Sequence, residues 1–211
     1  MVDKKHERKK ILEAVIKKDI LEAVVKILTH DGIQDLTMDK VASEAGVAKG
    51  TLYIHFKDKE EILEAAIEES LAPLVDELSM LLKSDLSPKV KLEQFSLSHL
   101  TYFDTHKELF RVLIYDYQQR QLQRSRYQNS RYWTFIKKVA GIIDDGVQSG
   151  LFHPFDSTKV AAIFIESNIA VVMQRLSSKS PGGIEEDVKF ITDILMHGIG
   201  TFKGQRLKAK G

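Results

Sequence analysis

The sequence of 211 residues contains no cysteine. This absence excludes disulfide bonds, thiolate zinc sites and cysteine nucleophiles. Proline is scarce, with four residues, and apolar runs such as residues 161–165 and 169–173 are far shorter than the ~20 residues that a membrane span needs. The first residues are charged, and no apolar segment precedes a cleavage site, so we expect no signal peptide. These absences favour a cytoplasmic protein without a membrane partner.

An excess of one charge is also lacking, because 31 lysines and arginines stand against 30 aspartates and glutamates. The net charge of +1 means that any contact with nucleic acid must come from a local arrangement of charges. One such arrangement lies at the beginning, where residues 1–18 contain seven lysines or arginines and three acids. The basic residues near the C-terminus are interpreted as a solvated end.

Helical periodicity dominates the rest of the chain. Apolar residues recur at helical spacing almost everywhere, and no alternating run has the length of a strand. We expect an all-α fold of about nine helices. An Asp-Gly pair at 31–32 should end one helix, Thr37 should cap the next, and Ser-Pro at 87–88 should open another. Pro73 should bend or interrupt the long helix that begins near residue 57.

A short repeat marks the first helix, because residues 10–17 resemble residues 19–26. At about 100° per residue, a shift of nine residues turns the second apolar face about half a turn away from the first. One straight helix cannot bury both faces in the same small core. We therefore expect residues 1–16 to form a basic extension that packs on a partner subunit or lies near DNA. The alternative is a first helix that is simply long, with its front half exposed.

Two short helical segments follow, joined by Ala-Gly-Val at 45–47. Val41 and Ala42 in the first segment and Leu52 in the second can be buried only if the two helices cross over a tight turn. The alanine allows close approach, the glycine accepts a left-handed backbone, and the valine fills the corner. This pattern predicts a helix-turn-helix whose second helix is free to enter a major groove.

Residues 18–63 resemble the DNA-binding domain of the TetR family. The resemblance is carried by residues of fixed spacing, namely Thr37, Val41, Ala42, Ala45, Gly46, Val47, Gly50, Thr51, Leu52, Tyr53, His55, Phe56, Lys59, Glu60, Ile62 and Leu63. It implies a three-helix DNA-binding domain at 17–63, preceded by the extension at 1–16. It also implies an all-helical domain at 64–211 that binds a ligand and dimerises.

The resemblance also assigns DNA contacts. Thr37 falls where the family contacts a phosphate at a helix N-terminus. The assigned set is Thr37, Ala48, Lys49, Gly50, Thr51, Tyr53, His55 and Lys59, of which Lys49, Gly50 and Thr51 fall where the family reads bases and Tyr53, His55 and Lys59 where it holds phosphates. Lys49 is the side chain expected to read a base, because lysine can donate to guanine O6 and N7. In the alternative interpretations Tyr53 is a packed aromatic and His55 braces the turn.

Strong apolar stripes mark the segments 157–177 and 184–202. The family pairs its last two helices with those of a second copy, so the resemblance implies a homodimer. The residues expected at its interface are Phe164, Ile165, Val172, Ile191, Leu195 and Ile199. The alternative is that both helices belong to the core of a monomer.

A ligand pocket is expected in the larger domain, because several large apolar side chains there carry polar tips. The candidates are Phe95, His99, Tyr102, Phe103, Phe110, Tyr117, Trp133, Phe164 and Asn168. At these spacings most such residues are more often plain core. The stretch 118–131 is rich in arginine and glutamine. It is either a solvated connection between helices or a cationic mouth for an anionic ligand such as an acyl-CoA.

The sequence thus predicts a ligand-responsive repressor that binds a near-palindromic operator in double-stranded DNA as a homodimer. A small apolar or amphipathic effector would release it. Metal-ligand spacing, a glycine-rich phosphate loop and a nucleophile elbow are missing, so we expect no enzyme, no cofactor and no metal. The alternative is an effector-independent DNA-binding dimer whose large domain serves only dimerisation or protein recruitment.

Overall fold

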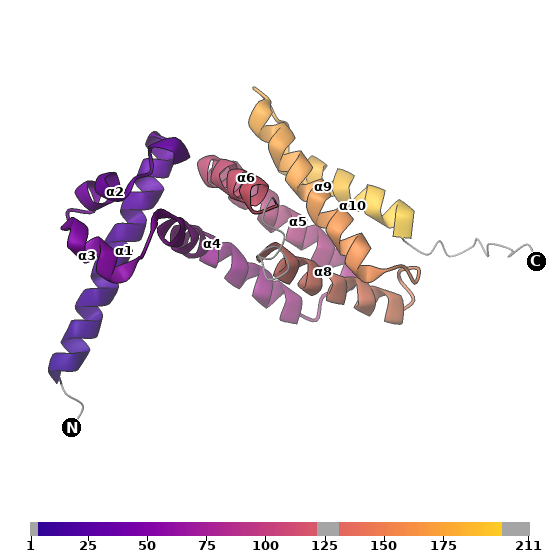
Figure 1. The fold of residues 1–211 in the computed structure, drawn as a ribbon. Helices are drawn as coiled ribbons and strands as arrows, with labels where there is room; N and C mark the ends of the chain where they lie inside the picture. The colour runs from indigo at the N-terminus through magenta and orange to yellow at the C-terminus, as the bar shows by residue number, and fades with distance from the viewer. Residues whose placement is uncertain (1–3, 122–130, 200–211) are drawn as a thin grey trace, which may run out of the picture. The chain divides into compact units, whose positions relative to one another are not determined.

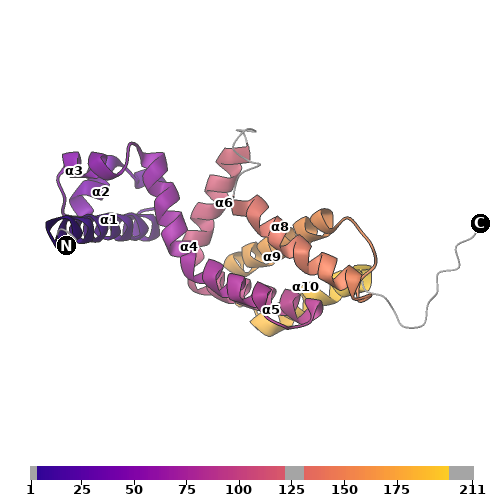
Figure 2. The ribbon, with the colours of Figure 1, turned by 90° about the horizontal axis from the view of Figure 1, so that it is seen from below.

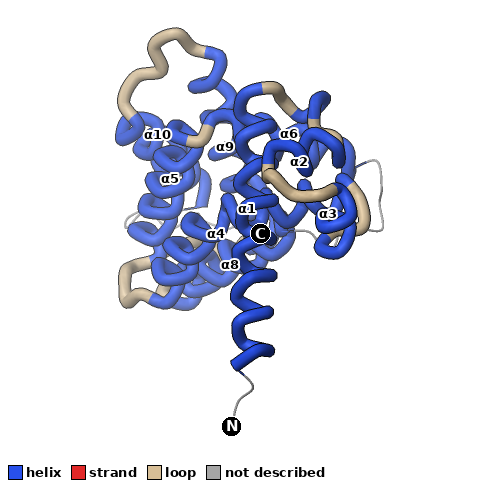
Figure 3. The backbone as a smooth tube through the Cα atoms, turned by 90° about the vertical axis from the view of Figure 1, so that its left-hand side faces the viewer, coloured by secondary structure: helices blue, strands red, loops and turns tan. Residues whose placement is uncertain are grey.

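The computed structural model describes the backbone of residues 4–121 and 131–199, and the side chains of residues 6–114 and 133–199. These residues form nine α-helices and one 3₁₀ helix, which confirms the all-α prediction (Figures 1 and 3). The elements are α1 (Lys4–His30), η1 (Ile33–Asp35), α2 (Met38–Glu44), α3 (Lys49–His55), α4 (Lys59–Lys83), α5 (Pro88–Thr105), α6 (Lys107–Gln121), α8 (Arg131–Gln148), α9 (Ser157–Ser177) and α10 (Ile184–Ile199).

The described chain divides into two compact units. The first unit contains α1, η1, α2, α3, the front of α4 as far as Pro73, and α6 as far as Gln119. The second unit contains the rest of α4 together with α5, α8, α9 and α10. The division inferred from the sequence, after residue 63, falls inside α4, and those domain limits remain a prediction.

Pro73 lies inside α4, which continues from Lys59 to Lys83 as one helix. The helix is therefore not interrupted at this proline, and the bend that was expected as the other outcome stays a prediction. A proline removes one backbone hydrogen bond from a helix, but buried leucines hold α4 on both sides of it. Leu71 is 7% exposed and Leu74 is 3% exposed. The proline instead coincides with the boundary between the two units.

The first unit is built on α1, which is one continuous helix from Lys4 to His30. Its rear half supplies the core through residues such as Ile20, Val24 and Ile27, whereas residues 6–15 are all exposed. This arrangement matches the alternative given in the sequence analysis, a first helix that is simply long and has its front half exposed. α1 ends at the predicted stop, where Gly32 has a φ of 83° and its N–H donates to the carbonyl oxygen of Ile27 at 3.1 Å.

The second unit is a bundle in which α5, α8, α9 and α10 pack against one another (Figure 2). Its core holds the fully buried side chains Leu92, Leu100, Ile136, Ile143, Phe152 and Phe164. α9 begins as predicted, because the Asp156 carboxylate accepts from the backbone N–H groups of Thr158 and Lys159 at 3.1 Å each. This cap also lowers the pKa of Asp156.

α9 has the length and a mean hydropathy of 1.3 that a membrane-crossing helix would need. The sequence analysis, which looked only at unbroken apolar runs, missed this property. Within the second unit α9 is a core helix that contacts α5, α8 and α10. Its apolar composition is explained by that burial, because a helix covered by neighbours on several sides carries apolar residues around most of its circumference.

A buried arginine near the end of α9 joins three helices. Arg175 is 7% exposed; its Nε donates to Asp104 of α5 at 3.3 Å and its Nη1 to Asp187 of α10 at 2.6 Å. The same Nη1 lies 3.4 and 3.3 Å from the carbonyl oxygens of Pro181 and Gly182. A buried charge is tolerated when it is paired in this way. The sequence analysis did not anticipate this network.

Candidate nucleic-acid interface

The turn between α2 and α3 has the geometry that its sequence predicts. Thr37 caps α2, since its hydroxyl accepts from the backbone N–H of Lys40 at 3.2 Å. Gly46 has a φ of 66°, in the left-handed region that favours glycine. The Val47 N–H donates to the Ala42 carbonyl at 3.0 Å and closes the corner. The prediction of a helix-turn-helix is confirmed.

α3 is held on one side only. Leu52 is completely buried, and Phe56 at the C-terminal cap is 3% exposed. On the opposite side Gly50, Tyr53 and Ile54 are exposed, and an added Cβ at Gly50 would meet no atom within 4 Å. The outer face of α3 is therefore open for a groove of DNA, and Gly50 allows its backbone to come close.

The sequence-assigned DNA contacts lie on or beside this face. Lys49 and Tyr53 are exposed, whereas Thr51 and His55 are half-buried. The His55 ring lies 6.5 Å from the ring of Phe56, which fits the alternative in which it braces the turn. Of the others, Ala48 is the N-cap of α3, Thr37 the N-cap of α2, and Lys59 the first residue of α4. Their contact with DNA remains a prediction.

Two residues of this face were missed by the sequence analysis. Ile54 is 79% exposed and lies in the last turn of α3, on its outer face. An apolar side chain there suits the methyl group of thymine in a major groove. Asp39 of α2 forms an ion pair with the proposed base reader, with its Oδ1 2.7 Å from Lys49 Nζ. The hydrogen bond that Lys49 donates to Asp39, and then the charge of this carboxylate, raise the pKa of Lys49. The ion pair therefore holds the Lys49 ammonium against α2.

Only some of the residues predicted to line the ligand pocket lie close together. Five of its nine residues, which we call the aromatic cluster, are joined through ring contacts: Phe95, His99, Tyr102, Phe103 and Phe164. Asn168 is buried one turn beyond Phe164 on α9, and Trp133 lies on α8. Phe110 belongs to the first unit. The side chain of Tyr117, like the arginine-rich stretch 118–131, lies outside the described side chains.

Buried polar atoms without hydrogen-bond partners occur in the aromatic cluster and in two residues next to its members, Ser96 and Asn168. These atoms are Ser96 Oγ, His99 Nδ1 and Asn168 Oδ1. Asn168 cannot turn its amide around, because its Nδ2 donates to the carbonyl oxygen of Phe164 at 2.8 Å. Burial lowers the pKa of His99 to about 4. A buried polar atom left unpaired costs about 1–3 kcal/mol, so a partner at this place would stabilise the second unit.

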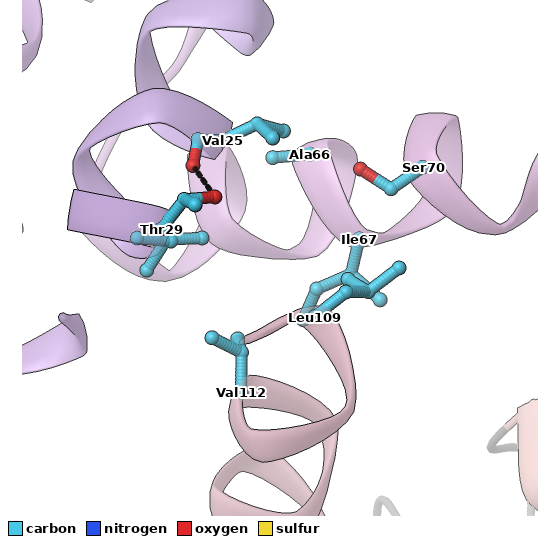
Figure 4. A pocket seen from close by; sticks show the side chains of 8 residues that line it. Val25, Thr29, Ala66, Ile67, Ser70, Leu109 and Val112 are labelled. Atoms are coloured by element: carbon cyan, nitrogen blue, oxygen red, sulfur yellow. Dashed lines mark hydrogen bonds between the residues drawn. The ribbon is translucent and has the colours of Figure 1, made fainter. Parts of the chain in front are cut away.

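Two hollows found among the described residues lie elsewhere, both in the first unit. A small pocket of about 20 Å³ lies between α1, α4 and α6, lined by Val25, Leu28, Thr29, Ala66, Ile67, Ser70, Leu109 and Val112 (Figure 4). It has room for about one water molecule. A more open groove of about 330 Å³ runs along α1 and α4. Neither hollow contains a residue of the predicted pocket.

The residues predicted at a dimer interface are already buried within the single chain. Phe164, Ile165, Val172, Ile191, Leu195 and Ile199 are all between 1% and 8% exposed. Other apolar residues of the same two helices are open instead, namely Ile163 and Met173 on α9 and Phe190 and Ile194 on α10, at 48–63% exposure. The periodicity identified the correct helices as strongly apolar but could not separate their inner faces from their outer faces.

A capped helix, a left-handed glycine corner and a second helix with an open outer face define a helix-turn-helix protein that binds DNA and regulates transcription. The family model described as bacterial regulatory proteins of the tetR family matches residues 20–66. Residues 20–66 therefore carry the DNA-binding domain of the TetR family of transcription regulators. The resemblance inferred from the sequence is confirmed.

Known relatives agree with this assignment. The fatty acid metabolism regulator protein of Bacillus subtilis is 28% identical over 131 residues, which cover 62% of this chain and 68% of that protein. The structure of FadR from Bacillus subtilis in complex with stearoyl-CoA has a TM-score of 0.75 and 22% identity, over 86% of this chain and 98% of that one. A regulator from Saccharomonospora viridis in complex with choline has a TM-score of 0.74 and 19% identity, over 90% and 100%.

Proposed function

We propose that the protein is a ligand-responsive repressor that binds a near-palindromic operator as a homodimer and works in the cytoplasm. The observation that carries this proposal is the open outer face of α3, with Lys49 at its start and Ile54 in its last turn. One helix of seven residues covers too little DNA for a specific complex. Two copies related by a twofold axis would place two such helices in successive major grooves.

The dimer would form through α9 and α10. Their exposed apolar residues, Ile163, Met173, Phe190 and Ile194, are the outward surface that a second copy can cover. The six residues first assigned to the interface would then support this surface from the inside. Replacing Phe190 by Glu should give a monomer in analytical ultracentrifugation. The matched change Leu151→Glu, at an exposed leucine outside these helices, should leave the dimer intact.

The effector would act in the second unit, at the aromatic cluster and the neighbouring polar atoms of Ser96 and Asn168. A ligand with an apolar part would lie against the rings, and a hydrogen-bonding group would satisfy the unpaired atoms. The relatives support an amphipathic molecule, since one is named for fatty acid metabolism and one structure holds stearoyl-CoA. We therefore propose an acyl-CoA as the first class to test.

Release from DNA requires the effector to prefer one conformation of the dimer. A ligand shifts the equilibrium only by the difference between its affinities for the two states. The alternative, a dimer without an effector, would leave the unpaired atoms of Ser96, His99 and Asn168 to ordered water.

The test is a gel shift with the DNA upstream of the protein's own gene. A complex with the mass of one dimer is expected, and Lys49→Ala should weaken it about tenfold, the loss of one good base contact. The matched control is Lys179→Ala, an exposed lysine of the second unit. Stearoyl-CoA should release the DNA from the wild type, and Asn168→Ala should reduce this response. Equal binding by both lysine variants would contradict the proposal, and release by none of a panel of acyl-CoAs would favour the effector-free alternative.

A further inference from the structure

The front of α1 is a solvated helix that the helix-turn-helix does not use. All residues from His6 to Val15 are exposed, and only from Ile20 onward does α1 enter the core. At a rise of 1.5 Å per residue, the helix extends about 20 Å from Lys17 to its first residue, Lys4. We call residues 4–16 the arm. The arm continues the helix that supports α3 and belongs to the same unit (Figure 1).

One face of the arm is basic. Lys10, Lys17 and the core residue Val24 follow one another at intervals of seven residues, so they lie on the same side of the helix within about 40°. Lys9 and Glu13 lie beside them and form an ion pair with each other at 3.8 Å. Lys17 fixes what this side faces, because its Nζ lies 5.8 Å from the ring centre of Phe56 at the end of α3.

The opposite face of the arm is apolar. Val15 lies nine residues before Val24, which is about half a turn away on the helix, and Ile11 and Leu12 adjoin it. These three residues are 50–60% exposed. Arg8 also lies on this side, about 160° around the helix from Val24. The apolar face therefore points away from α3, whereas Lys9 and Lys10 lie on the side that the arm shares with α3.

From this geometry we infer that the arm is a second DNA contact, which binds the phosphate backbone beside the segment read by α3. The charge of Lys10 is opposite to that of the phosphates, and the arm extends α1 beyond Lys17, which lies next to Phe56 at the end of α3. Its reach of about 20 Å corresponds to about six base pairs at 3.4 Å each. This inference rests on the proposed DNA binding and adds a sequence-independent contact to it.

Two single substitutions test the inference, because they remove the same charge from opposite faces. Lys10→Gln changes the basic face and Arg8→Gln changes the apolar face, two residues away. Binding is measured by fluorescence anisotropy over a range of KCl concentrations. Two duplexes are compared. One is the operator as delimited by footprinting of a variant that lacks residues 2–16, and thus the whole arm with Lys10; the other is the same operator with six more base pairs at each end.

The wild type should bind the longer duplex with the steeper salt dependence. Lys10→Gln should lower the slope on the longer duplex by about 0.9 for each arm, the value for one phosphate contact, and leave the shorter duplex unaffected. Arg8→Gln should resemble the wild type on both. Circular dichroism at 222 nm checks that the helix content is unchanged.

Equal slopes for the two variants on the longer duplex would overturn the inference while leaving the repressor proposal intact. A wild type that binds neither duplex would overturn the repressor proposal, and the arm inference with it. A loss of oligomer mass with Leu12→Gln, together with unchanged DNA slopes for Lys10→Gln, would assign the arm to contact between protein copies instead.

Discussion

The two units of the chain differ in where their polar and charged side chains lie. In the first unit the core is apolar, and the described ion pairs, such as Lys26–Glu44, Lys40–Asp31 and Lys49–Asp39, lie at the surface. In the second unit the core itself is partly polar. All buried polar or charged residues found in the described chain belong to it, namely Lys91, Ser96, Asn168, Arg175 and Thr192.

This difference suits the two kinds of recognition proposed above, of DNA by the first unit and of an effector by the second. A DNA duplex is large and charged, so it is met by side chains that stand in water on a rigid apolar scaffold. A small molecule can be discriminated inside a core, where an unpaired donor or acceptor is costly and a matching ligand gains correspondingly more. The comparison can be tested by asking which polar groups affect folding and which affect only DNA binding.

The largest effect is expected at Arg175. Arg175→Met keeps much of the side-chain volume but leaves Asp104 and Asp187 without their cation in a partly buried place. The free energy of unfolding should fall by about 3–5 kcal/mol, as is typical when one partner of a buried pair is removed. Urea denaturation followed by circular dichroism measures it.

The matched change in the first unit is Lys26→Met, which breaks the exposed pair with Glu44. Exposed ion pairs contribute little to stability, so this variant should unfold at nearly the wild-type urea concentration. If the two variants lost equal stability, the contrast between the units would be wrong.

The next effect is a pH dependence caused by His99. Burial lowers its pKa from 6.5 to about 4. As the pH falls below 6.5, His99 becomes protonated in the unfolded chain but stays neutral in the folded chain. The free energy of unfolding therefore decreases, and this decrease is complete below about pH 4. The full loss is at most about 3 kcal/mol. His99→Phe removes the titrating group and should flatten the curve of unfolding free energy between pH 6.5 and 4.

His30→Gln serves as the control for this measurement, because His30 is exposed in the folded chain as it is in the unfolded one. It should retain the wild-type slope. A His99→Phe variant that lost stability with acid as steeply as the wild type would show that His99 does not titrate in the proposed way.

The fold could be predicted from the sequence because the features that begin and end its helices act between residues close together in the chain. Thr37 as an N-cap, Gly32 and Gly46 as left-handed glycines and Asp156 before α9 each act within a few residues of the chain. The spacing around the turn then constrained which side of α3 had to be buried. These features needed no knowledge of distant contacts.

The rest depended on contacts between distant segments. Asp39 reaches Lys49 across the turn, and Arg175 meets a carboxylate 71 residues earlier in the chain, which no periodicity reveals. The stripes of α9 and α10 contain both inner and outer apolar residues, so Phe164 was assigned to an interface although its own chain buries it. The repeat in α1 predicted two apolar faces on opposite sides. Both lie on one continuous helix, of which only the rear half is buried.

The smallest expected effect belongs to the surface of the first unit, at Asp39. Its carboxylate holds Lys49 at 2.7 Å and adds a negative charge beside the proposed DNA face. Asp39→Asn should therefore bind operator DNA more tightly, by about twofold to fivefold, the range of an exposed ion pair. Glu44→Gln, which breaks another ion pair of the same helix, is the matched control and should change the affinity less. Combining Asp39→Asn with Lys49→Ala separates two causes: the gain should vanish if Asp39 acts by holding Lys49 and persist if it acts by repelling phosphates. A weaker complex with Asp39→Asn would mean that the carboxylate positions Lys49 for DNA rather than competing with it.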